Sequence, residues 1–466
     1  MLNTRRPRAS GGRRAHTPLV LALTLLGAGS GLGCKGDEPT GPAATGNAPS
    51  LDAAGHKTII VSNSAELVAA LVPENVGLRI LVRAGTYAID APLTVPDGVT
   101  LEGEGVMRFD GAGLPVGFAA GTQTTLSMSS NVPGNLLALG NGVTIRGLEI
   151  ADLPGRAGNV IGVVSRAAGD RVSATIAESE IVNPNPIAGA IGYGLLVITD
   201  NPSAGSPHEG AALTARVERS LIRSPAGGGG LFAFNFAALG SVSVTLAGNV
   251  IGGEITANGG VSRPDAVHDS RTRIESRRNL YRDDSADPCT SPRSIGWNLA
   301  GGSSPPLPIP VAATARNMLR VHSVDDRIER FTTGVIATGT RRFFALAGPS
   351  TDNSLDLELL GTTISTPSCG GAGFVRDLVL IAADAPFAEL APGDGNSLRA
   401  VIRGVTGSGT RFNRYGDVLG PSGPLPAALE GTGNRLEIVG NLNAFARTNR
   451  DINPLPGTEF FTGGAP

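Results

Sequence analysis

The chain has 466 residues, of which 66 are Gly and 33 are Pro, while only 17% are charged and 4% are aromatic. This composition predicts many turns and few helices. Without residues 1–34, which hold five arginines and no acidic residue, the chain has 33 basic and 40 acidic residues, a net charge of −7. A surplus of negative charge argues against a nucleic-acid partner.

Residues 1–34 have the pattern of an export signal. Five arginines precede the apolar run PLVLALTLLG, which is too short to span a membrane permanently. The run ends in Gly31-Leu32-Gly33-Cys34, which resembles the lipobox of bacterial lipoproteins. We therefore expect a lipid anchor at Cys34 and a location in the cell envelope or outside the cell, with an ordinary signal peptide as the alternative. Residues 35–56, rich in Pro, Gly and Ala, are expected to form a flexible linker.

One short phrase recurs along the rest of the chain. Its copies are TIRGLEI (144–150), TIAESEI (175–181), RVERSLI (216–222), TLAGNVI (245–251), ESRRNLY (275–281) and ATARNML (313–319), with weaker copies at 358–364 and 437–443. Apolar and polar positions alternate within the phrase, which predicts a strand with one face inward. The fifth position holds Ser179, Ser220, Asn249, Asn279, Asn317 and Asn441. If the chain coils back on itself, these side chains would stack in one column and bond to one another.

The start of this region has its own pattern. Asn63 to Glu66 has the form of a capping box that opens a short helix, ELVAALVPE. With ILVRAGTY (80–87) and PLTVPDGVTLEGEG (92–105), it is similar to the N-terminal cap and first coil of the pectin-lyase-like superfamily. The resemblance implies an all-β fold, a right-handed parallel β-helix of about ten coils over residues 57–445. Register is poor over residues 323–420, and residues 446–466 are expected to be a C-terminal tail.

The densest polar stretch is RPDAVHDSRTRIESRRNLYRDD, residues 263–284. If Ile274 points inward, alternation places a row of guanidinium groups on the outer face of one strand, where they could bind the carboxylates of an acidic polysaccharide. The segment around His268 is similar to the Asp-Pro-His-Asp motif of alginate epimerases and related lyases. The candidate catalytic residues are His268, Asp269, Arg271 and Tyr281, and the candidate substrate contacts are Arg273 and Arg277. A solvent-exposed face with many salt bridges is the alternative.

Register suggests a second set of candidates. Glu254, Asp284 and His322 each lie three residues beyond the end of a phrase, so they are expected in one column on consecutive coils, about 5 Å apart. Two carboxylates and an imidazole at that spacing could bind a divalent cation such as calcium. A plain turn is the alternative.

Two further features bear on the fold. Cys289 and Cys369 are expected on loops that leave the same edge two coils apart, so the sequence only slightly favours a disulfide between them. Phe232, Phe234 and Phe236 alternate and are expected to point into the solenoid as an aromatic stack, with a sugar-stacking platform as the alternative.

These features support two interpretations of function. The leading one is an exported, monomeric protein that engages an extracellular or periplasmic polysaccharide, with a uronate-directed lyase or epimerase as the activity if it is catalytic. The chain has no lysine after Lys57 and no Gly-His-Gly, which disfavours polygalacturonase-type hydrolysis and lyases with a lysine base. The other interpretation is a non-catalytic structural or adhesive rod at the cell surface.

Overall fold

The computed structural model describes residues 50–51, 57–188, 191–199, 209–262, 266–291, 294–304, 312–342, 348–369, 375–385, 390, 393–408, 413–419, 431–442 and 445. The predicted export signal with Cys34, most of the predicted linker and the predicted tail lie outside these residues. None of the helices in the described residues is both long and apolar enough to cross a membrane.

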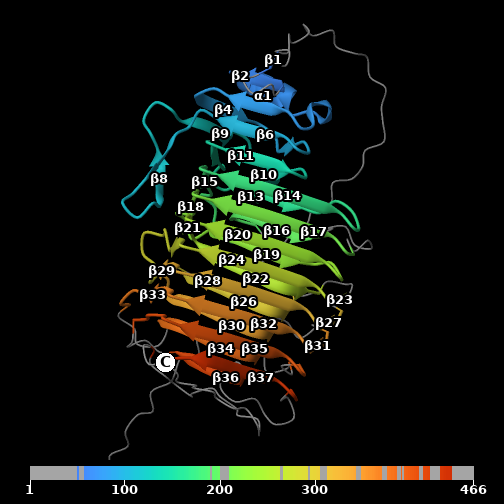
Figure 1. Cartoon of the computed structure of the whole chain (residues 1–466), viewed down its shortest axis with the longest axis vertical. Coiled ribbons are helices and arrows are strands. Elements are labelled where there is room, and N and C mark those ends of the chain that lie inside the picture. Colours follow the sequence, from blue (N-terminus) through green and yellow to red (C-terminus); the bar gives the residue numbers. More distant parts are fainter. Residues whose placement is uncertain are drawn as a thin grey trace, which may run out of the picture. The chain divides into compact units, whose positions relative to one another are not determined.

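The described residues form a parallel β-helix with three long sheets, A, B and C, that the chain visits in turn (Figure 1). Sheet A has 13 strands: β1 (Ser50–Leu51), β2 (Lys57–Val61), β3 (Arg79–Val82), β6 (Thr100–Gly103), β11 (Val143–Arg146), β14 (Arg171–Ala177), β17 (Ala212–Glu218), β20 (Ser241–Ala247), β24 (Arg271–Arg277), β28 (Met318–Val324), β32 (Ser354–Leu360), β35 (Ser397–Arg403) and β37 (Arg435–Gly440). Within this sheet only the pair β1 and β2 is antiparallel.

Sheet B has nine short strands: β4 (Gly85–Ile89), β9 (Thr124–Met128), β12 (Glu149–Ala151), β15 (Glu180–Val182), β18 (Leu221–Arg223), β21 (Val250–Gly252), β25 (Leu280–Arg282), β29 (Arg327–Glu329) and β33 (Thr363–Ser365). Sheet C has ten: β5 (Leu93–Val95), β10 (Gly134–Leu139), β13 (Gly158–Val164), β16 (Tyr193–Thr199), β19 (Gly229–Asn235), β22 (Glu254–Val261), β26 (Ile295–Ser303), β30 (Thr333–Arg341), β34 (Arg376–Asp384) and β36 (Arg414–Leu419). The predicted fold class is thus confirmed, and residues 323–420 contain regular strands.

Smaller elements complete the fold. A three-stranded sheet holds β23 (Val267–His268), β27 (Thr314–Ala315) and β31 (Ser350–Thr351), and an antiparallel hairpin holds β7 (Met107–Phe109) and β8 (Pro115–Phe118). Among the described residues, the helical elements are α1 (Ser64–Ala70) and the 3₁₀ turn η1 (Pro73–Asn75). The Asn63 Oδ1 accepts from the Glu66 N–H at 2.9 Å, so the predicted cap begins α1.

The interior follows from period-two alternation. In sheet A, Ile145, Ile176, Val217 and Leu246 pair in register on successive strands and are at most 1% exposed. Because the same positions on every coil are apolar, each side chain stacks on its counterpart and one continuous core forms. The phenylalanines break this expectation: Leu231 and Ala233 face the core, while Phe232 and Phe234 face outward from sheet C in a separate buried cluster. The predicted inward stack is therefore wrong.

The corner between sheets A and B contains the predicted polar ladder. The Ser220 N–H donates to Asn249 Oδ1 at 2.9 Å, and the Asn249 N–H donates to Asn279 Oδ1 at 2.8 Å. The next residue in the ladder is Asp326, whose Oδ1 accepts from the Asn279 N–H at 2.8 Å. Asn317, which the sequence placed there, belongs instead to a second ladder at the corner between sheets C and A.

The second ladder is built from the same local chemistry. The Asn317 N–H donates to Asn353 Oδ1 at 3.1 Å, and the Asn353 N–H donates to Asn396 Oδ1 at 3.1 Å. Arg316 has φ 53° and Arg278, at the other corner, has the same φ of 53°. Each corner thus places a left-handed residue before its ladder residue, which is why the phrase at 313–319 was assigned to the wrong corner.

Candidate functional site

The predicted row of guanidinium groups lies on the outer face of sheet A. Ile274 points inward and is 2% exposed, while Arg271, Arg273 and Arg277 are exposed, as the alternation predicts. The Nε of Arg273 lies 2.5 Å from Glu275 Oε1 on the same strand. The row is therefore open to solvent and partly neutralised by its own neighbours.

His268 and Asp269 lie at the corner that precedes this strand. Asp269 accepts from Arg316 through Nε at 2.9 Å and Nη2 at 2.7 Å, and its Oδ2 lies 2.9 Å from His268 Nδ1. The bonds from Arg316 and then from His268 lower the pKa of Asp269 to about 2. A carboxylate held so firmly in its ionised form is a poor proton donor or acceptor near neutral pH.

Tyr281 lies in the interior of the solenoid rather than beside these residues. It is 0% exposed, its hydroxyl is 2.6 Å from Ser276 Oγ, and its ring meets Trp297 edge-on at 5.1 Å. Burial, and next the nearby Asp326, raise the pKa of Tyr281 well above its ordinary value. Tyr281 therefore cannot reach a ligand at the surface, and the predicted catalytic set does not line one groove.

The predicted metal column also does not form. Gly252 pairs with Arg282, so Glu254 and Asp284 follow at matching steps of adjacent coils. His322, however, lies on the outer face of sheet A, 3.5 Å from Glu358 and 3.8 Å from Glu275. Within the described residues, no group of three or more His, Cys, Asp or Glu side chains is arranged to hold a metal ion. His322 differs from its prediction for the same reason as Asn317, because the phrase at 313–319 leads into β28 at the corner between sheets C and A.

The structure contains a cleft of about 270 Å³ on the outer side of sheet B. The β7 and β8 hairpin, inserted between β6 and β9, projects to the left of the solenoid in Figure 1 and runs beside β15 and β18. The cleft lies between this hairpin and three strands of sheet B. It is lined by Asp110, Leu114, Pro115, Val116, Leu221, Arg223, Val250, Leu280 and Arg282.

The floor of the cleft is apolar. Leu221, Val250 and Leu280 pair in register on β18, β21 and β25, and Leu114 at the hairpin tip packs against them. The tip is shaped by Asp110, whose Oδ1 accepts from the Ala112 and Leu114 N–H groups at 2.9 Å. Burial of the leucine thus fastens the hairpin to sheet B and leaves a concave surface beside it.

Two arginines stand next to this floor, each held by a carboxylate. Arg223 Nε lies 2.7 Å from Glu180 Oε1, and Arg282 Nε lies 2.7 Å from Asp284 Oδ1. The arginine side chains are 44% and 41% exposed, whereas Glu180 and Asp284 are 10% and 11% exposed. The carboxylates therefore anchor the guanidinium groups from the protein side, and both arginines line the cleft.

Glu180 and Asp284 differ in their surroundings. Burial raises the pKa of Glu180, the Arg223 charge opposes this rise, and the neighbouring Glu149 charge adds to it. The side chain of Asp284 lies over Gly252 on the preceding coil. This is possible because Gly252 has no side chain, since a Cβ on residue 252 would overlap the Asp284 carboxylate. Its Oδ2 is 3.4 Å from the Ser224 N–H.

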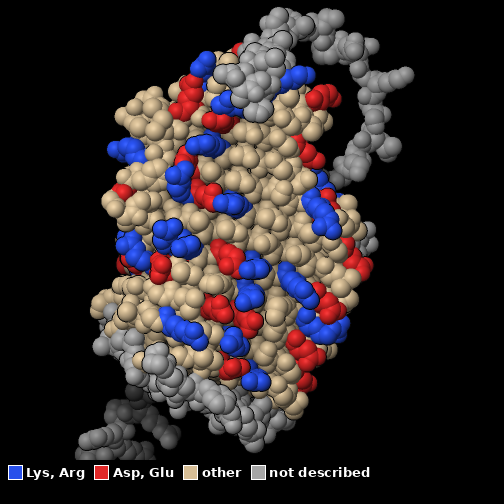
Figure 2. Space-filling model, viewed as in Figure 1, with Lys and Arg blue, Asp and Glu red and all other residues tan. Residues whose placement is uncertain are grey.

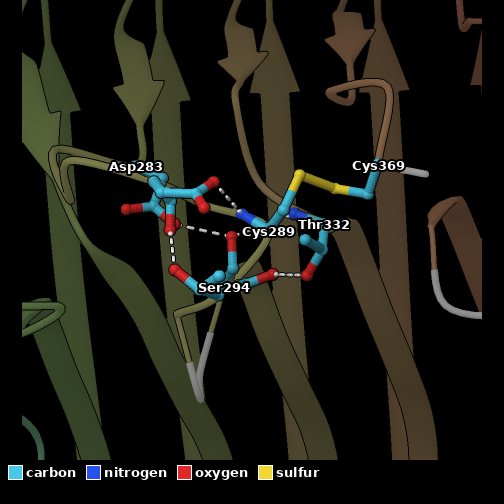
Figure 3. The surroundings of a disulfide bond; sticks show 7 residues. Asp283, Cys289, Ser294, Thr332 and Cys369 are labelled. Atoms are coloured by element: carbon cyan, nitrogen blue, oxygen red, sulfur yellow. Dashed lines mark hydrogen bonds between the residues drawn. A yellow bond between two sulfur atoms is a disulfide. The ribbon is translucent and has the colours of Figure 1, made fainter. Parts of the chain in front are cut away.

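The loop that begins after Arg282 is fastened by a disulfide. Cys289 and Cys369 are bonded, with their Cα atoms 5.7 Å apart, so the pairing that the sequence left open is formed. Figure 3 shows Asp283 beside Ser294, whose Oγ donates to Asp283 Oδ2 at 2.5 Å, and Thr332, whose Oγ1 donates to the Ser294 carbonyl at 2.8 Å. These contacts hold the chain segment that carries Asp284.

The cleft is not among the predicted sites, although the sequence contains one signal for it. The residue after each phrase end faces outward on sheet B, and on three consecutive coils it is Arg223, Gly252 and Arg282. No sequence pattern predicts that the hairpin at residues 107–118 packs on strands more than 100 positions later in the chain.

Comparison with known proteins gives no match: no family model, no curated protein and no solved structure matches the chain.

Proposed function

We propose that the protein is an exported, lipid-anchored β-helix protein of the pectin-lyase-like type that binds an acidic polysaccharide in the cleft beside sheet B. The observation that carries the proposal is the combination of an apolar floor with two guanidinium groups anchored at its edge. A pyranose ring has an apolar face that suits such a floor, and a uronate carboxylate suits the paired donors of a guanidinium. The export pattern before Cys34 supports a location where such glycans occur.

Isothermal titration of the purified protein with oligouronates tests this proposal. Replacement of both Arg223 and Arg282 by Gln should weaken binding at least tenfold, since charge-assisted hydrogen bonds to the ligand are lost. Arg273→Gln is a matched control, because Arg273 also pairs through Nε with a carboxylate two residues along the same chain segment but lies on the open face of sheet A. An unchanged affinity in the double variant, or an equal loss in Arg273→Gln, would place the binding elsewhere.

A uronate-directed lyase or epimerase is a second candidate function, and one observation favours it. Glu180 is a mostly buried carboxyl group with a raised pKa beside a guanidinium, an environment that is common for general acids and bases. Incubation with acidic glycans should then produce unsaturated uronate that absorbs in the ultraviolet, or a changed epimer ratio by NMR, and Glu180→Gln should abolish either signal. Binding without turnover would favour the adhesive or structural alternative.

A further inference from the structure

The outward-facing residues beside the cleft alternate in charge along the solenoid axis. On β18, β21 and β25 this column holds Arg223, Gly252 and Arg282. Parallel strands are about 4.8 Å apart, so the two arginines stand about 10 Å from each other. The position between them has no side chain of its own, and the carboxylate of Asp284 lies over it.

The sequence of charges along the column is therefore positive, negative, positive. Asp284 is held over Gly252 because Arg282 binds its Oδ1 at 2.7 Å, and it is only 11% exposed. A ligand carboxylate placed above Gly252 would face this fixed negative charge at short range, where partial burial strengthens the repulsion. A hydroxyl or amide N–H at the same position would instead donate a hydrogen bond to Asp284.

The apolar side chains of the floor also form a column along the solenoid axis. Leu221, Val250 and Leu280 form a column parallel to the first one, one apolar side chain on each coil. A ligand that runs along the axis meets a charged position at every coil, beside a floor whose side chains are 2–8% exposed because Leu114 packs on them. A pyranose residue in an extended chain is about as long as one coil is high, so one sugar would lie over each strand.

We infer that the cleft selects a glycan in which carboxylated residues alternate with neutral ones. The carboxylated sugars lie over β18 and β25, next to Arg223 and Arg282. The neutral sugar lies over β21 and donates an O–H or N–H to Asp284. This inference rests on the proposed function, since it specifies the ligand of the same cleft.

Titration with three hexasaccharides tests the inference: a hyaluronan fragment, in which uronate alternates with an N-acetylated sugar, an oligogalacturonate, in which every residue is acidic, and a neutral chito-oligosaccharide. The hyaluronan fragment should bind about tenfold more tightly than the oligogalacturonate, since only the latter places a carboxylate against Asp284. Asp284→Asn should bring these two affinities closer together, because the repulsion is removed while the side chain keeps its size. Arg216→Gln should leave the ratio unchanged, because Arg216 pairs through Nε with Glu218 at 2.7 Å on the outer face of sheet A and does not line the cleft.

The outcomes separate the inference from the function on which it rests. Equal affinities in the parent protein, or tighter binding of the oligogalacturonate, would overturn the alternation while leaving the cleft as a site for acidic glycans. Binding of none of the three, or of the neutral fragment most tightly, would overturn both. The ratio of the two affinities in the parent protein tests the inference even if Asp284→Asn does not fold.

Discussion

The outer face of sheet A and the cleft beside sheet B contain the same ion pair in different surroundings. Arg273 with Glu275 and Arg282 with Asp284 both join a guanidinium Nε to a carboxylate two residues further on, at 2.5 and 2.7 Å. Glu275 is 31% exposed and Asp284 only 11%. An exposed pair is screened by water and leaves both side chains free to move, whereas a carboxylate that is mostly buried fixes its arginine.

This difference shows what distinguishes a binding surface from a merely charged one. On the face drawn in Figure 2, basic and acidic side chains are interspersed along the solenoid. On sheet A, for example, Arg216 pairs with Glu218 and Arg273 with Glu275, so charges of opposite sign are neighbours. In the cleft, anchored arginines stand beside a concave apolar floor, which gives a ligand both a surface to cover and charges to pair with.

The largest effect is expected from removal of the disulfide that fastens the cleft side of the molecule. Cys289→Ser with Cys369→Ser should lower the free energy of unfolding by roughly 2 to 5 kcal/mol, since the bond closes a long loop. The two residues are 80 positions apart. Chemical denaturation measures the loss. Hydrogen exchange should quicken more at Ser285, in the loop after β25, than in β24. An equal increase in both places would contradict a local role.

The hairpin should be the next most sensitive element. Leu114 is 7% exposed against the floor of the cleft, whereas Val116, two residues on, is 45% exposed. Leu114→Ala should destabilise the docked hairpin by about 2 kcal/mol, because it removes the apolar contact with sheet B. Val116→Ala is the control and should change little. Faster hydrogen exchange within β7 and β8 reports the opening, and equal exchange in both variants would show that Leu114 does not anchor the hairpin.

Period-two alternation, the ladder and the resemblance of the N-terminal cap and first coil to the pectin-lyase-like superfamily together predicted the fold. Ile274 faces inward and its neighbours outward because the pleat of a strand permits nothing else once one position is apolar. Ser179 to Asn279 form one column because they end equivalent strands. Asn317 was misplaced because both corners use a left-handed residue followed by Asn, so local sequence does not tell one corner from the other.

The site could not be predicted for different physical reasons. Tyr281 has a polar hydroxyl group and was predicted to be accessible. Its hydroxyl forms a hydrogen bond with Ser276 inside the solenoid, which permits full burial of the side chain. The cleft depends on where the hairpin lies, and that position is set by the contact of Leu114 with residues of three later coils. Long-range packing of this kind leaves no periodic pattern in the sequence.

Replacement of one arginine on each face should have a smaller effect on the free energy of unfolding, and the effect should differ between the cleft and sheet A. Arg282→Gln leaves the mostly buried Asp284 without its charged partner and should lower the free energy of unfolding by about 1 to 2 kcal/mol. Arg273→Gln leaves Glu275 in contact with water and should cost less than about 0.5 kcal/mol. Thermal and chemical denaturation of the two variants, side by side, measures the difference. Equal losses would mean that the cleft pair is as well solvated as the pair on sheet A.

The smallest effects are expected in the titration of the carboxyl groups. Asp269 and Glu180 both pair with arginine, but the bonds from Arg316 and His268 lower the pKa of Asp269 from 3.8 to about 2, whereas burial raises the pKa of Glu180 above 4.5. Asp269 thus adds stability that is complete above pH 3.8 and is lost as the pH falls toward 2. Glu180 acts in the opposite sense, since its protonated form is favoured in the folded protein, and stability falls as the pH rises from 4.5 through its raised pKa.

Carbon-detected NMR of the two carboxyl groups measures these values directly. Glu180→Gln should remove the loss of stability on the alkaline side of pH 4.5, and Asp269→Asn should remove the loss on the acid side of pH 3.8. Binding of a carboxylated glycan should raise the pKa of Glu180 further, because a second negative charge would then share Arg223. A Glu180 that titrates at or below 4.5 would mean that its burial does not outweigh the charge of Arg223, and the cleft would then lack the buried anchor that separates it from the face of sheet A.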